Sequence, residues 1–289
     1  MNWQCRNHKL KCDGYPLIMG ILNVTPDSFS DGARFTNAEA AVTAAKQMLK
    51  EGADIIDIGG ESTRPGAAAV DAAEELLRIA PVVEALVAET DAVISIDTTK
   101  AAVAHETLRL GAHIINDVTA LTGDVAMVET VGEFNAGTVL MHMQGTPRTM
   151  QCNPRYENVT EDIYCYLEQR IETVTAAGLA RETIAVDPGI GFGKTTEHNL
   201  LLIANLEKFT KLQQPLLVGL SRKRFIGILT GMSVENRLSG SLAGLACSVL
   251  NGANIMRVHD VGPARQAARI AAAVRCHENI GAAVETAVC

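Results

Sequence analysis

Short apolar runs alternate with helical stretches along almost the whole chain. The runs are rich in β-branched residues and lack the strict polar alternation of a strand with one face in water. They cover residues 16–23, 54–59, 93–97, 113–118, 138–143, 183–188, 215–221 and 254–260. Runs of this kind are typical of parallel strands that are buried on both faces. The pattern therefore predicts eight buried parallel strands.

The segments between these runs have the composition of helices, and several end before glycine, the preferred residue just past a helix C-terminus. They cover residues 37–51, 71–90, 100–110, 124–134, 157–177, 196–209, 235–250 and 263–278. Eight strands that alternate with eight helices predict an α/β fold, the closed (β/α)8 TIM barrel. The alternative is an open doubly wound sheet, but no G-x-G-x-x-G motif follows the first run.

The length of the chain agrees with one barrel. A barrel of this kind typically takes about 250 residues, and the chain has 289. We expect residues 1–15 to form an N-terminal extension, residues 16–280 a single barrel domain, and residues 281–289 a C-terminal tail. Aromatic residues make up only 4% of the chain, so Ala, Val, Leu and Ile must supply most of the core.

Charge and cysteine content limit the partners and the compartment. The net charge of −8 argues against general nucleic-acid binding, which needs a basic surface. The seven cysteines are scattered and form no C-x-x-C pair, which favours reduced thiols and a cytoplasmic protein. We expect neither a signal peptide nor a membrane span, because the N-terminus lacks an apolar stretch and no run reaches about 18 apolar residues.

Polar side chains stand at the ends of most of the predicted strands. They are Asn23, Asp97, Asn116, Asp117, His142, Asp187, Ser221, Arg257 and His259. In a barrel these ends face one mouth, where barrel enzymes place their active sites. Any single one is explained equally well as a cap or a loop hydrogen bond. Their occurrence at nearly every strand predicts an active site.

Basic residues are concentrated after the last two strands. Arg222, Lys223 and Arg224 follow the seventh run, and Arg257 and His259 lie in the eighth. The loops after strands 7 and 8 are the usual phosphate-binding place of this fold. Arginine offers a fork of donors for phosphate oxygens, and lysine offers a point charge. We therefore expect an anion site here, with a solvated basic turn as the alternative.

Asp97, Asn116 and Asp187 combine two carboxylates with one amide. Such a set can pair with a guanidine-like or aminopyrimidine edge, which presents several N–H donors and an oxo acceptor. A metal site is the alternative, but no His or Cys ligand set accompanies these residues at the spacing of a zinc site. Asp97 is also a candidate general base.

Two long loops are rich in Gly, Ser, Thr and Pro. They cover residues 23–35 and 59–67. Loops of this composition over a barrel mouth commonly act as lids, and Phe29 and Arg64 are suited to contacting a ligand. The alternative is that both are ordinary surface loops.

Seven segments of the chain resemble dihydropteroate synthases. They are MGILNVTPDSFSDG from Met19, DIGGESTRPGA from Asp57, GAHIINDV from Gly111, LMHMQGTPRTMQ from Leu140, DPGIGFGK from Asp187, GLSRKRFIG from Gly219 and RVHDV from Arg257. The match extends over roughly residues 16–261, with the motifs in family order and at family-like spacing. Each motif alone is weak, but the set of seven is specific.

The resemblance implies a transferase of folate biosynthesis that joins 6-hydroxymethyl-7,8-dihydropterin diphosphate to p-aminobenzoate and releases diphosphate. The implied pterin site is Asp97, Asn116, Met141, Asp187, Phe192, Gly219, Lys223 and Arg257. The implied diphosphate site is Asn23, Thr63, Arg257 and His259, with Asn23 also the contact for Mg²⁺. The implied p-aminobenzoate site is Phe29, Thr63, Arg64, Pro65, Phe192 and Lys223.

The implied chemistry is SN1-like, with Asp97, Asp187, Lys223, Arg257 and His259 as the catalytic residues. Mg²⁺ and the cations assist the departure of diphosphate, and the carboxylates support the positive charge left on the pterin. An arylamine is neutral at pH 7, so Asp97 becomes a binding and electrostatic group rather than a strong base. A pairing of Asp31 with Arg64 in the closed loops is a hypothesis.

The resemblance also bears on assembly and inhibition. Family members are commonly dimeric through late helices, so we expect a homodimer, although packing against the barrel explains the small apolar residues after Glu235 equally well. Many members carry Ser where this chain has Arg224. Two alternatives exist for Arg224: it assists binding of the p-aminobenzoate carboxylate, or it points to solvent. The loop after Asp187 lacks the additional residues of sulfonamide-insensitive relatives, so we expect sulfonamide sensitivity.

Three other functions compete with this one. A pterin-binding methyltransferase barrel shares the Asp and Asn pocket but needs neither long loop nor the late cations. A non-catalytic pterin-binding paralogue is disfavoured by the intact candidate residues Asn23, Thr63, Arg64, Lys223 and His259. A Schiff-base aldolase requires Lys223 to have a depressed pKa in an apolar pocket.

Overall fold

A computed structural model of the protein describes residues 1–25, 34–61, 70–146 and 149–276, with side chains from residue 38 onward in the second range. Eight parallel strands form one sheet in the order β8-β7-β6-β5-β4-β3-β10-β9. They are β3 (Leu17–Asn23), β4 (Ile55–Gly59), β5 (Val93–Asp97), β6 (Ile114–Asp117), β7 (Gly137–Met141), β8 (Ile184–Asp187), β9 (Leu217–Gly219) and β10 (Ile255–Val258). A parallel bridge between Val186 and Leu216 joins the two ends of the sheet, so the predicted barrel is confirmed.

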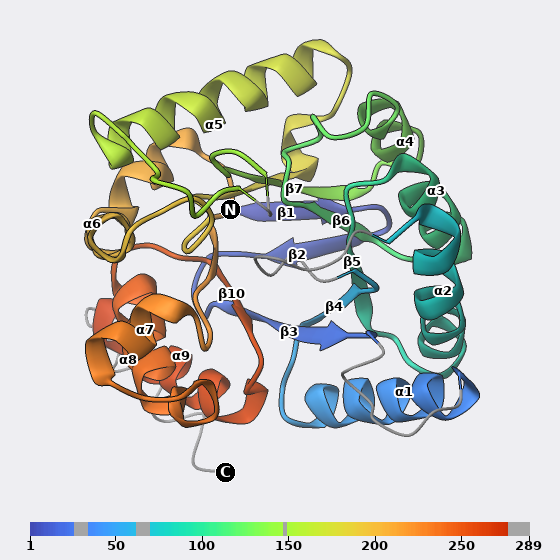
Figure 1. Ribbon diagram of the computed structural model, residues 1–289. Coiled ribbons are helices and arrows are strands. Elements are labelled where there is room, and N and C mark those ends of the chain that lie inside the picture. The colour runs from blue at the N-terminus through green and yellow to red at the C-terminus, as the bar shows by residue number, and fades with distance from the viewer. Residues whose placement is uncertain (26–33, 62–69, 147–148, 277–289) are drawn as a thin grey trace.

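Helices surround the barrel as a ring (Figure 1). They are α1 (Arg34–Lys50), α2 (Ala72–Glu89), α3 (Ala101–Leu110), α4 (Met127–Glu133), α5 (Val159–Ala176), α6 (Thr196–Ala204), α7 (Arg224–Thr230), α8 (Leu238–Leu250) and α9 (Val261–Arg275), with 3-10 turns η1 (Arg181–Thr183), η2 (Leu206–Leu212) and η3 (Val234–Asn236). The Asp71 side chain caps α2, and Gly111 ends α3 at a φ of 117°. Within the described ranges, no helix is long and apolar enough to cross a membrane.

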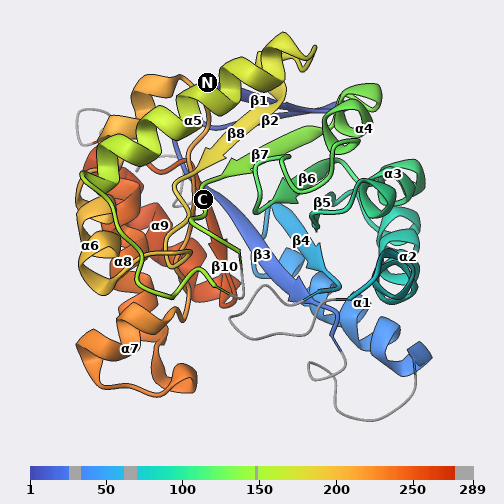
Figure 2. The same cartoon turned by 45° about the horizontal axis from the view of Figure 1, so that its top comes forward.

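Two helical segments differ from the sequence prediction. A single helix over residues 196–209 is wrong, because α6 ends at Ala204 and a 3-10 turn follows. The Asn205 side chain donates to the Leu201 carbonyl at 2.7 Å and so competes with the helical backbone pattern. The short helix α7 was not predicted, because seven residues are too few to reveal helical periodicity. Figure 2 shows α7 at the periphery of the molecule.

The barrel interior changes from apolar to polar along the strands. Each strand places one buried apolar residue near its start in a single cluster, consisting of Met19, Ile55, Val93, Ile114, Val139, Ala185, Leu217 and Ile255. Side chains two positions apart on a strand share a face. The next inward-facing positions are therefore Ile21, Asp57, Ser95, Asn116, Met141, Asp187, Gly219 and Arg257. An apolar floor thus lies beneath a largely polar layer.

Residues 2–11 form an antiparallel hairpin of β1 (Asn2–Cys5) and β2 (His8–Lys11), which the sequence prediction treated only as an extension. Trp3 and Cys5 are fully buried in the same cluster as the first inward-facing strand residues. The Trp3 indole Nε1 donates to the Thr183 carbonyl at 2.8 Å. Figure 1 shows the two strands across the centre of the helix ring. The hairpin therefore closes the end of the barrel opposite the polar strand ends.

Gly137, the first residue of β7, lies directly against the hairpin. An alanine Cβ there would lie 2.5 Å from Cys5 Sγ and 3.0 Å from Ile114 Cγ1. We expect Gly137→Ala to lower the free energy of unfolding by about 1–3 kcal/mol, the usual cost of overpacking a core. Trp3 is the only tryptophan in the chain, so its fluorescence during urea unfolding reports on the hairpin directly.

Gly132→Ala in α4 is the matched control. Its added Cβ would meet only Leu179 Cδ1, at an ordinary 3.6 Å. Because alanine favours a helix interior over glycine, this variant is expected to be neutral or more stable by up to about 1 kcal/mol. Unfolding midpoints for Gly137→Ala and Gly132→Ala that both equal that of the wild type would show that the hairpin is not tightly packed on β7.

Candidate functional site

The carboxyl ends of the strands gather the candidate residues at one mouth of the barrel. Asp97 ends β5 and is paired in register with Asn116 of β6, while Asp187 ends β8 and is paired with Met141 of β7. Arg257 of β10 is paired with Gly219 of β9. Six of the eight residues of the implied pterin site thus lie on the strands themselves.

Arg257 of β10 bridges two other strands of the barrel, β4 and β5. Its Nε donates to Asp57 and its Nη2 donates to Asp97, both at 2.6 Å. The Asn116 side chain donates to the same Asp57 oxygen at 3.1 Å. Although burial opposes the charged form, the two carboxylates outweigh it and raise the pKa of Arg257. Arg257 is therefore a permanent cation that fixes the polar layer.

Asp57 is a site residue that the sequence reasoning missed. It is fully buried on β4, and its second oxygen has no hydrogen-bond partner among the described residues. Asp57 stands inside an apolar run rather than at its end, so the pattern of polar strand ends does not select it. The available signal was an ionisable residue at an inward position of a buried strand, where such residues are rarely found without a partner.

The Asp97 carboxyl group changes between its protonated and ionised forms near pH 7. Burial raises the pKa of Asp97 to about 7, the neighbouring Arg257 opposes this rise, and the Asp57 carboxylate adds to it. An ionised carboxylate only accepts hydrogen bonds, whereas the protonated acid also donates one. The hydrogen-bonding character of the site therefore changes with pH around 7.

Asp187 and Lys223 form the second charged part of the mouth. Burial raises the pKa of Asp187, while Lys223 and a 2.7 Å hydrogen bond from the Gly189 N–H oppose that rise. Burial lowers the pKa of Lys223 to about 8, and Asp187 opposes that shift. The Lys223 Nζ donates to the Ile190 carbonyl and lies 4.4 Å from the centroid of the Phe192 ring. Phe192 and Lys223 therefore form one wall.

The loop that carries Phe192 is held by side chains that bond its carbonyls. Gln151 donates to the Gly191 carbonyl at 2.7 Å, Tyr156 to the Gly193 carbonyl at 2.8 Å, and Lys194 to the Phe192 carbonyl at 2.9 Å. Buried Lys194 also lies 3.1 Å from His142 Nδ1. Burial, with Lys194 beside it, lowers the pKa of His142 to about 3, so this imidazole is neutral and supports the loop.

Met141 and Gly219 are the uncharged neighbours of these charged residues on β7 and β9. Met141 is buried next to Asp187, where its thioether supplies an apolar surface. Gly219 faces Arg257, and a Cβ at this position would lie 3.6 Å from Arg257 Cβ. The glycine therefore leaves ordinary van der Waals space beside the aliphatic stem of Arg257. The polar layer thus has an apolar patch on which a flat ring can lie.

The cations after β9 and β10 have different roles. Arg222 is committed to Asp260 through two hydrogen bonds of 3.0 and 2.5 Å, so it is not the ligand donor that the basic run suggested. The Arg224 side chain is exposed at the start of α7. His259 lies against Ser221, with 3.0 Å between Nδ1 and Oγ. Lys223 and Arg257 are the cations of this group that contribute to the charged mouth, and His259 lies beside them on the loop after β10.

Asn23 ends β3 opposite Gly59, with a half-buried side chain. The candidate residues Phe29, Thr63, Arg64 and Pro65 lie outside the described residues, as does Asp31 with its hypothetical pairing to Arg64. Their predicted roles therefore stay predictions. The implied p-aminobenzoate site is represented in the described part of the chain by Phe192 and Lys223.

A charged cluster formed by Glu61 after β4, Glu75 of α2 and Lys100 at the N-cap of α3 was not predicted. Lys100 Nζ donates to Glu61 at 2.5 Å and to Glu75 at 2.6 Å. Glu75 is fully buried, and the second oxygen of Glu61 accepts from the Val70 N–H at 3.1 Å. Although burial opposes its charge, these carboxylates raise the pKa of Lys100. Lys100 therefore pairs with two carboxylates. One of these, Glu61, also holds the Val70 backbone.

Lys100→Met should destabilise the fold strongly. The change leaves the buried Glu75 carboxylate unpaired and facing Glu61, and breaking a buried ion pair typically costs about 3–5 kcal/mol. Urea unfolding at pH 7 measures the change. The control is Lys46→Met, which removes the same side chain from the exposed pair with Glu89 and is expected to cost less than about 1 kcal/mol. Equal losses in the two variants would contradict the assignment.

Comparisons with known proteins agree with this geometry. Residues 19–259 match the family model described as "Pterin binding enzyme". The chain is 48% identical over 256 residues to the dihydropteroate synthase of Escherichia coli K12, which covers 89% of this chain and 90% of that protein.

Two solved structures have the same fold. The Yersinia pestis dihydropteroate synthase with a sulfonamide drug complex matches with a TM-score of 0.90 and 45% identity, over 95% of this chain and 99% of that one. The Xanthomonas albilineans dihydropteroate synthase in complex with 7,8-dihydropteroate matches with a TM-score of 0.86 and 40% identity, over 96% and 99%. With the family model and the curated relative, these matches cover most of the chain. The chain belongs to the dihydropteroate synthase family of pterin-binding enzymes, which are transferases.

Proposed function

We propose that this chain is a dihydropteroate synthase in activity. It would condense 6-hydroxymethyl-7,8-dihydropterin diphosphate with p-aminobenzoate, giving 7,8-dihydropteroate and diphosphate. The observation that carries the proposal is the layer of Asp57, Asp97, Asn116 and Asp187 around Arg257 and Lys223 inside the mouth. The relatives reported above are named for this activity, and one of them was solved with 7,8-dihydropteroate.

The chemistry of the pterin fits this layer. Its aminopyrimidine edge presents N–H donors, for which the Asp97 and Asp187 carboxylates are acceptors, and its oxo group is an acceptor for the Lys223 ammonium. The Met141 side chain and the Phe192 ring offer apolar surfaces for the flat ring. Buried charged partners of this kind make the pocket selective for a ring that satisfies all of them.

The bond changes proceed in two steps. First the bond between the exocyclic CH₂ carbon and the diphosphate oxygen breaks, and both electrons leave with diphosphate. The ring nitrogens spread the positive charge, and Asp97 and Asp187 stabilise it electrostatically. The amine nitrogen of p-aminobenzoate then attacks the CH₂ carbon and loses one proton to solvent. Arg257 and His259 are the proposed partners of the departing anion.

A magnesium ion fits this scheme as a companion of the diphosphate. Within the described ranges there is no group of three or more His, Cys, Asp or Glu side chains that suits a metal ion. Mg²⁺, however, usually keeps several waters and binds through one or two protein oxygens together with substrate phosphates. The amide oxygen of Asn23 at the end of β3 is such a donor. The ion would neutralise negative charge on the leaving group.

A coupled assay tests the activity. The full-length protein is mixed with dihydropterin diphosphate, p-aminobenzoate and a series of Mg²⁺ concentrations, and both dihydropteroate and diphosphate are measured. We expect equal amounts of the two products and a requirement for Mg²⁺. Absence of dihydropteroate at every Mg²⁺ concentration would overturn the proposal. A sulfonamide added to the same assay should inhibit competitively with p-aminobenzoate.

We also propose that the protein is a homodimer. Four large apolar side chains within α7 and the turn after it are 44–56% exposed: Ile228, Leu229, Met232 and Val234. Exposed apolar patches of this kind on a globular domain commonly mark a protein interface. Light scattering of the wild type and of Leu229→Asp measures the oligomeric state. A wild type that is monomeric at micromolar concentration would exclude the dimer.

A reducing compartment, the cytoplasm, is proposed from the cysteines. Six cysteines in the described ranges are free thiols, and four of these are exposed: Cys152, Cys165, Cys247 and Cys276. Exposed free thiols persist where the thiol pool is kept reduced. Thiol titration of the native protein purified without reductant should therefore detect all four; loss of their reactivity would oppose this assignment.

A further inference from the structure

We propose that Lys194, together with the Tyr156 hydroxyl, is a positioning residue for Phe192, whose ring it holds in place at the mouth by fixing the backbone around it. The inference deepens the proposed function, on which the contact of Phe192 with p-aminobenzoate rests. Lys194 is only 3% exposed. Its Nζ donates to the Phe192 carbonyl at 2.9 Å and lies 3.1 Å from His142 Nδ1 and 3.4 Å from the His142 carbonyl oxygen.

The burial of Lys194 calls for a role, because a lysine is rarely buried this fully without a carboxylate beside it. Among the described residues Lys194 forms no ion pair with a carboxylate. Burial lowers the pKa of Lys194, and Asp187 opposes that shift. The contact with Phe192 does not depend on the outcome. A carbonyl oxygen only accepts, and an ammonium and a neutral amine both carry N–H groups that donate.

Every carbonyl of the loop from residue 190 to residue 193 accepts a hydrogen bond from a side chain. The donors, in chain order of the carbonyls, are Lys223, Gln151, Lys194 and Tyr156. Lys223 is also the proposed donor to the pterin, so it shares its N–H groups between the loop and the substrate. The other three have no proposed contact with a substrate. They therefore support the loop whether or not the site is filled.

The segment after β7 gives this support a firm base. Gly189 and Gly193 have positive φ values of 70° and 63°. A Cβ at Gly189 would lie 1.9 Å from the His142 carbonyl oxygen, and one at Gly193 would lie 2.7 Å from the Gln144 carbonyl oxygen. The loop thus lies directly on the backbone of the segment after β7. Lys194 joins the two at His142.

The backbone of Phe192 is fixed on both sides of its ring. The Phe192 N–H donates to the Gly189 carbonyl at 3.0 Å, and its carbonyl accepts from Lys194. The next residue, Gly193, has the widest choice of backbone conformations, and Tyr156 donates to its carbonyl at 2.8 Å. Without Lys194 or the Tyr156 hydroxyl, one peptide group beside Gly193 is free to rotate. The Phe192 ring then loses its fixed direction.

Lys194→Met and Tyr156→Phe each remove one of these donors and keep most of the side chain. Tyr156→Phe is the milder change, because the ring stays. Lys208→Met and Tyr164→Phe are the matched controls. The Lys208 Nζ lies 5.5 Å from the Tyr164 ring centroid, much as the Lys194 Nζ lies 6.0 Å from the Tyr156 ring centroid. The control pair has no hydrogen bond to residues 190–193 in the described part of the chain.

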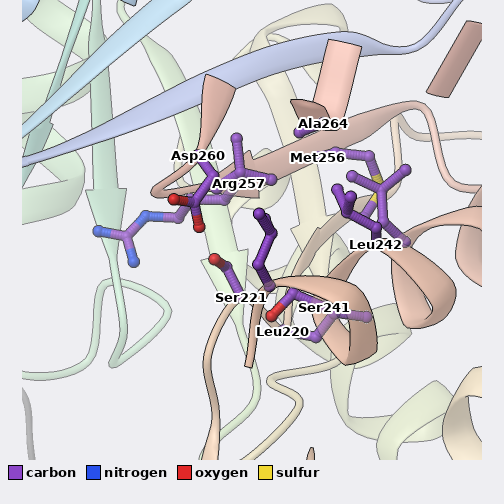
Figure 3. A pocket seen from close by; sticks show the side chains of 11 residues that line it. Leu220, Ser221, Ser241, Leu242, Met256, Arg257, Asp260 and Ala264 are labelled. Carbon is purple, nitrogen blue, oxygen red and sulfur yellow. The ribbon is translucent and has the colours of Figure 1, made fainter. Parts of the chain in front are cut away.

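Ser241→Ala is a control from the Lys223 side of the loop. Ser241 and Ser221 border a cavity between the loop after β9 and helix α8 (Figure 3). The Ser241 Oγ accepts from the Arg222 N–H at 2.9 Å, next to Lys223 in the chain. Its loss disturbs the backbone beside Lys223 and removes none of the four carbonyl contacts.

Fluorine magnetic resonance of the full-length protein labelled with 4-fluorophenylalanine tests the position of the ring. The chain has six phenylalanines, and Phe192→Leu identifies the resonance of Phe192. We expect Lys194→Met and Tyr156→Phe to shift or broaden this resonance, and the three control variants to leave it in place. An unmoved resonance in the folded variants would overturn the proposal, even if their stability is lower. If Lys194→Met does not fold, Tyr156→Phe decides. A shift in Ser241→Ala as large as in the test variants would also overturn the proposal, because the ring would then be placed from the Lys223 side.

Steady-state kinetics test the consequence for the reaction. The charged groups that receive the pterin are on strands and on Lys223, whereas p-aminobenzoate depends on Phe192. We expect Lys194→Met to lower kcat/KM for p-aminobenzoate about tenfold, as a displaced positioning group does, and to change KM for dihydropterin diphosphate less than about threefold. The control variants should match the wild type. Equal losses for both substrates, or no loss, would contradict the proposal. Because the fluorine resonance needs neither substrate nor turnover, failure of the proposed synthase activity is distinguishable from failure of this inference.

Discussion

Arg257→Met is expected to cost about 3–5 kcal/mol of unfolding free energy, because it leaves buried carboxylates without their cation. The wild-type guanidinium bonds Asp57 and Asp97 at 2.6 Å each, and its side chain is only 18% exposed. Loss of the cation should also push the pKa of Asp97 above its present value of about 7. Synthase activity should fall at least about a hundredfold, since one preorganised charge is removed from the site.

Arg257→Lys separates charge from geometry. A lysine keeps the positive charge but provides a point charge in place of a planar fork, so it cannot bridge two carboxylates in the same way. We expect this variant to retain part of the stability and little of the activity. Adding Asp57→Asn to Arg257→Met should recover part of the lost stability, because one of the unpaired charges is then removed.

The control for Arg257→Met is Arg265→Met. Arg265 donates to Asp54 at 2.7 Å, and both side chains are 26% exposed, so the pair resembles the Arg257 pairs in chemistry but not in burial. Its loss is expected to cost about 1 kcal/mol and to leave activity unchanged. Urea unfolding and the coupled assay measure both variants. A smaller loss of stability in Arg257→Met than in Arg265→Met would contradict the central role of the guanidinium.

The barrel and most of the polar mouth were accessible from the sequence for one physical reason. A strand buried on both faces must be apolar, so a polar residue within or just after such a run must have a partner. Asp97, Asn116, Asp187 and Arg257 were found in this way. Taking every second position back from the strand ends would also have selected Asp57, which occupies the same inward face of β4 as Ile55.

The features that the sequence did not reveal depend on contacts between distant segments. The hairpin around Trp3 is too short to be recognised as anything but an extension until the open end of the barrel is known. The commitment of Arg222 to Asp260 and the cluster around Lys100 join residues 25–39 positions apart. Charge alone suggested that Arg222 was a ligand donor. Only the fold shows that its carboxylate partner stands beside it.

Asp97→Asn is expected to produce a far less active but more stable protein. The polar layer and the residues just beyond it at the mouth include three carboxylates, of Asp57, Asp97 and Asp187, and two cations, of Lys223 and Arg257. One negative charge is therefore uncompensated when all five groups are ionised. Asparagine removes that charge and keeps an oxygen that can accept from Arg257. Activity should fall about a hundredfold, since the positive charge on the pterin loses one electrostatic partner.

The stability of Asp97→Asn should also depend less on pH than that of the wild type. The folded-state pKa of Asp97, about 7, lies above the ordinary aspartate value of 3.8, so the folded chain takes up a proton more readily than the unfolded chain. The corresponding stabilisation is fully present below pH 3.8 and is lost as the pH rises through about 7. The wild type should therefore lose stability between pH 5.5 and about 8, and Asp97→Asn should lose less over the same range.

Urea unfolding of both proteins at intervals across this pH range decides the point. At pH 8 the variant should be the more stable of the two, whereas near pH 5.5 the difference should narrow, because the wild-type carboxyl is then protonated. The activity of the wild type should rise with pH up to about 7 in the coupled assay, and the residual activity of Asp97→Asn should lack this rise. A variant less stable than the wild type at pH 8 would show that Asp97 is compensated in the folded state. Greater stability together with lost activity would instead identify Asp97 as a charge that the fold holds at a cost, because the cationic pterin requires it.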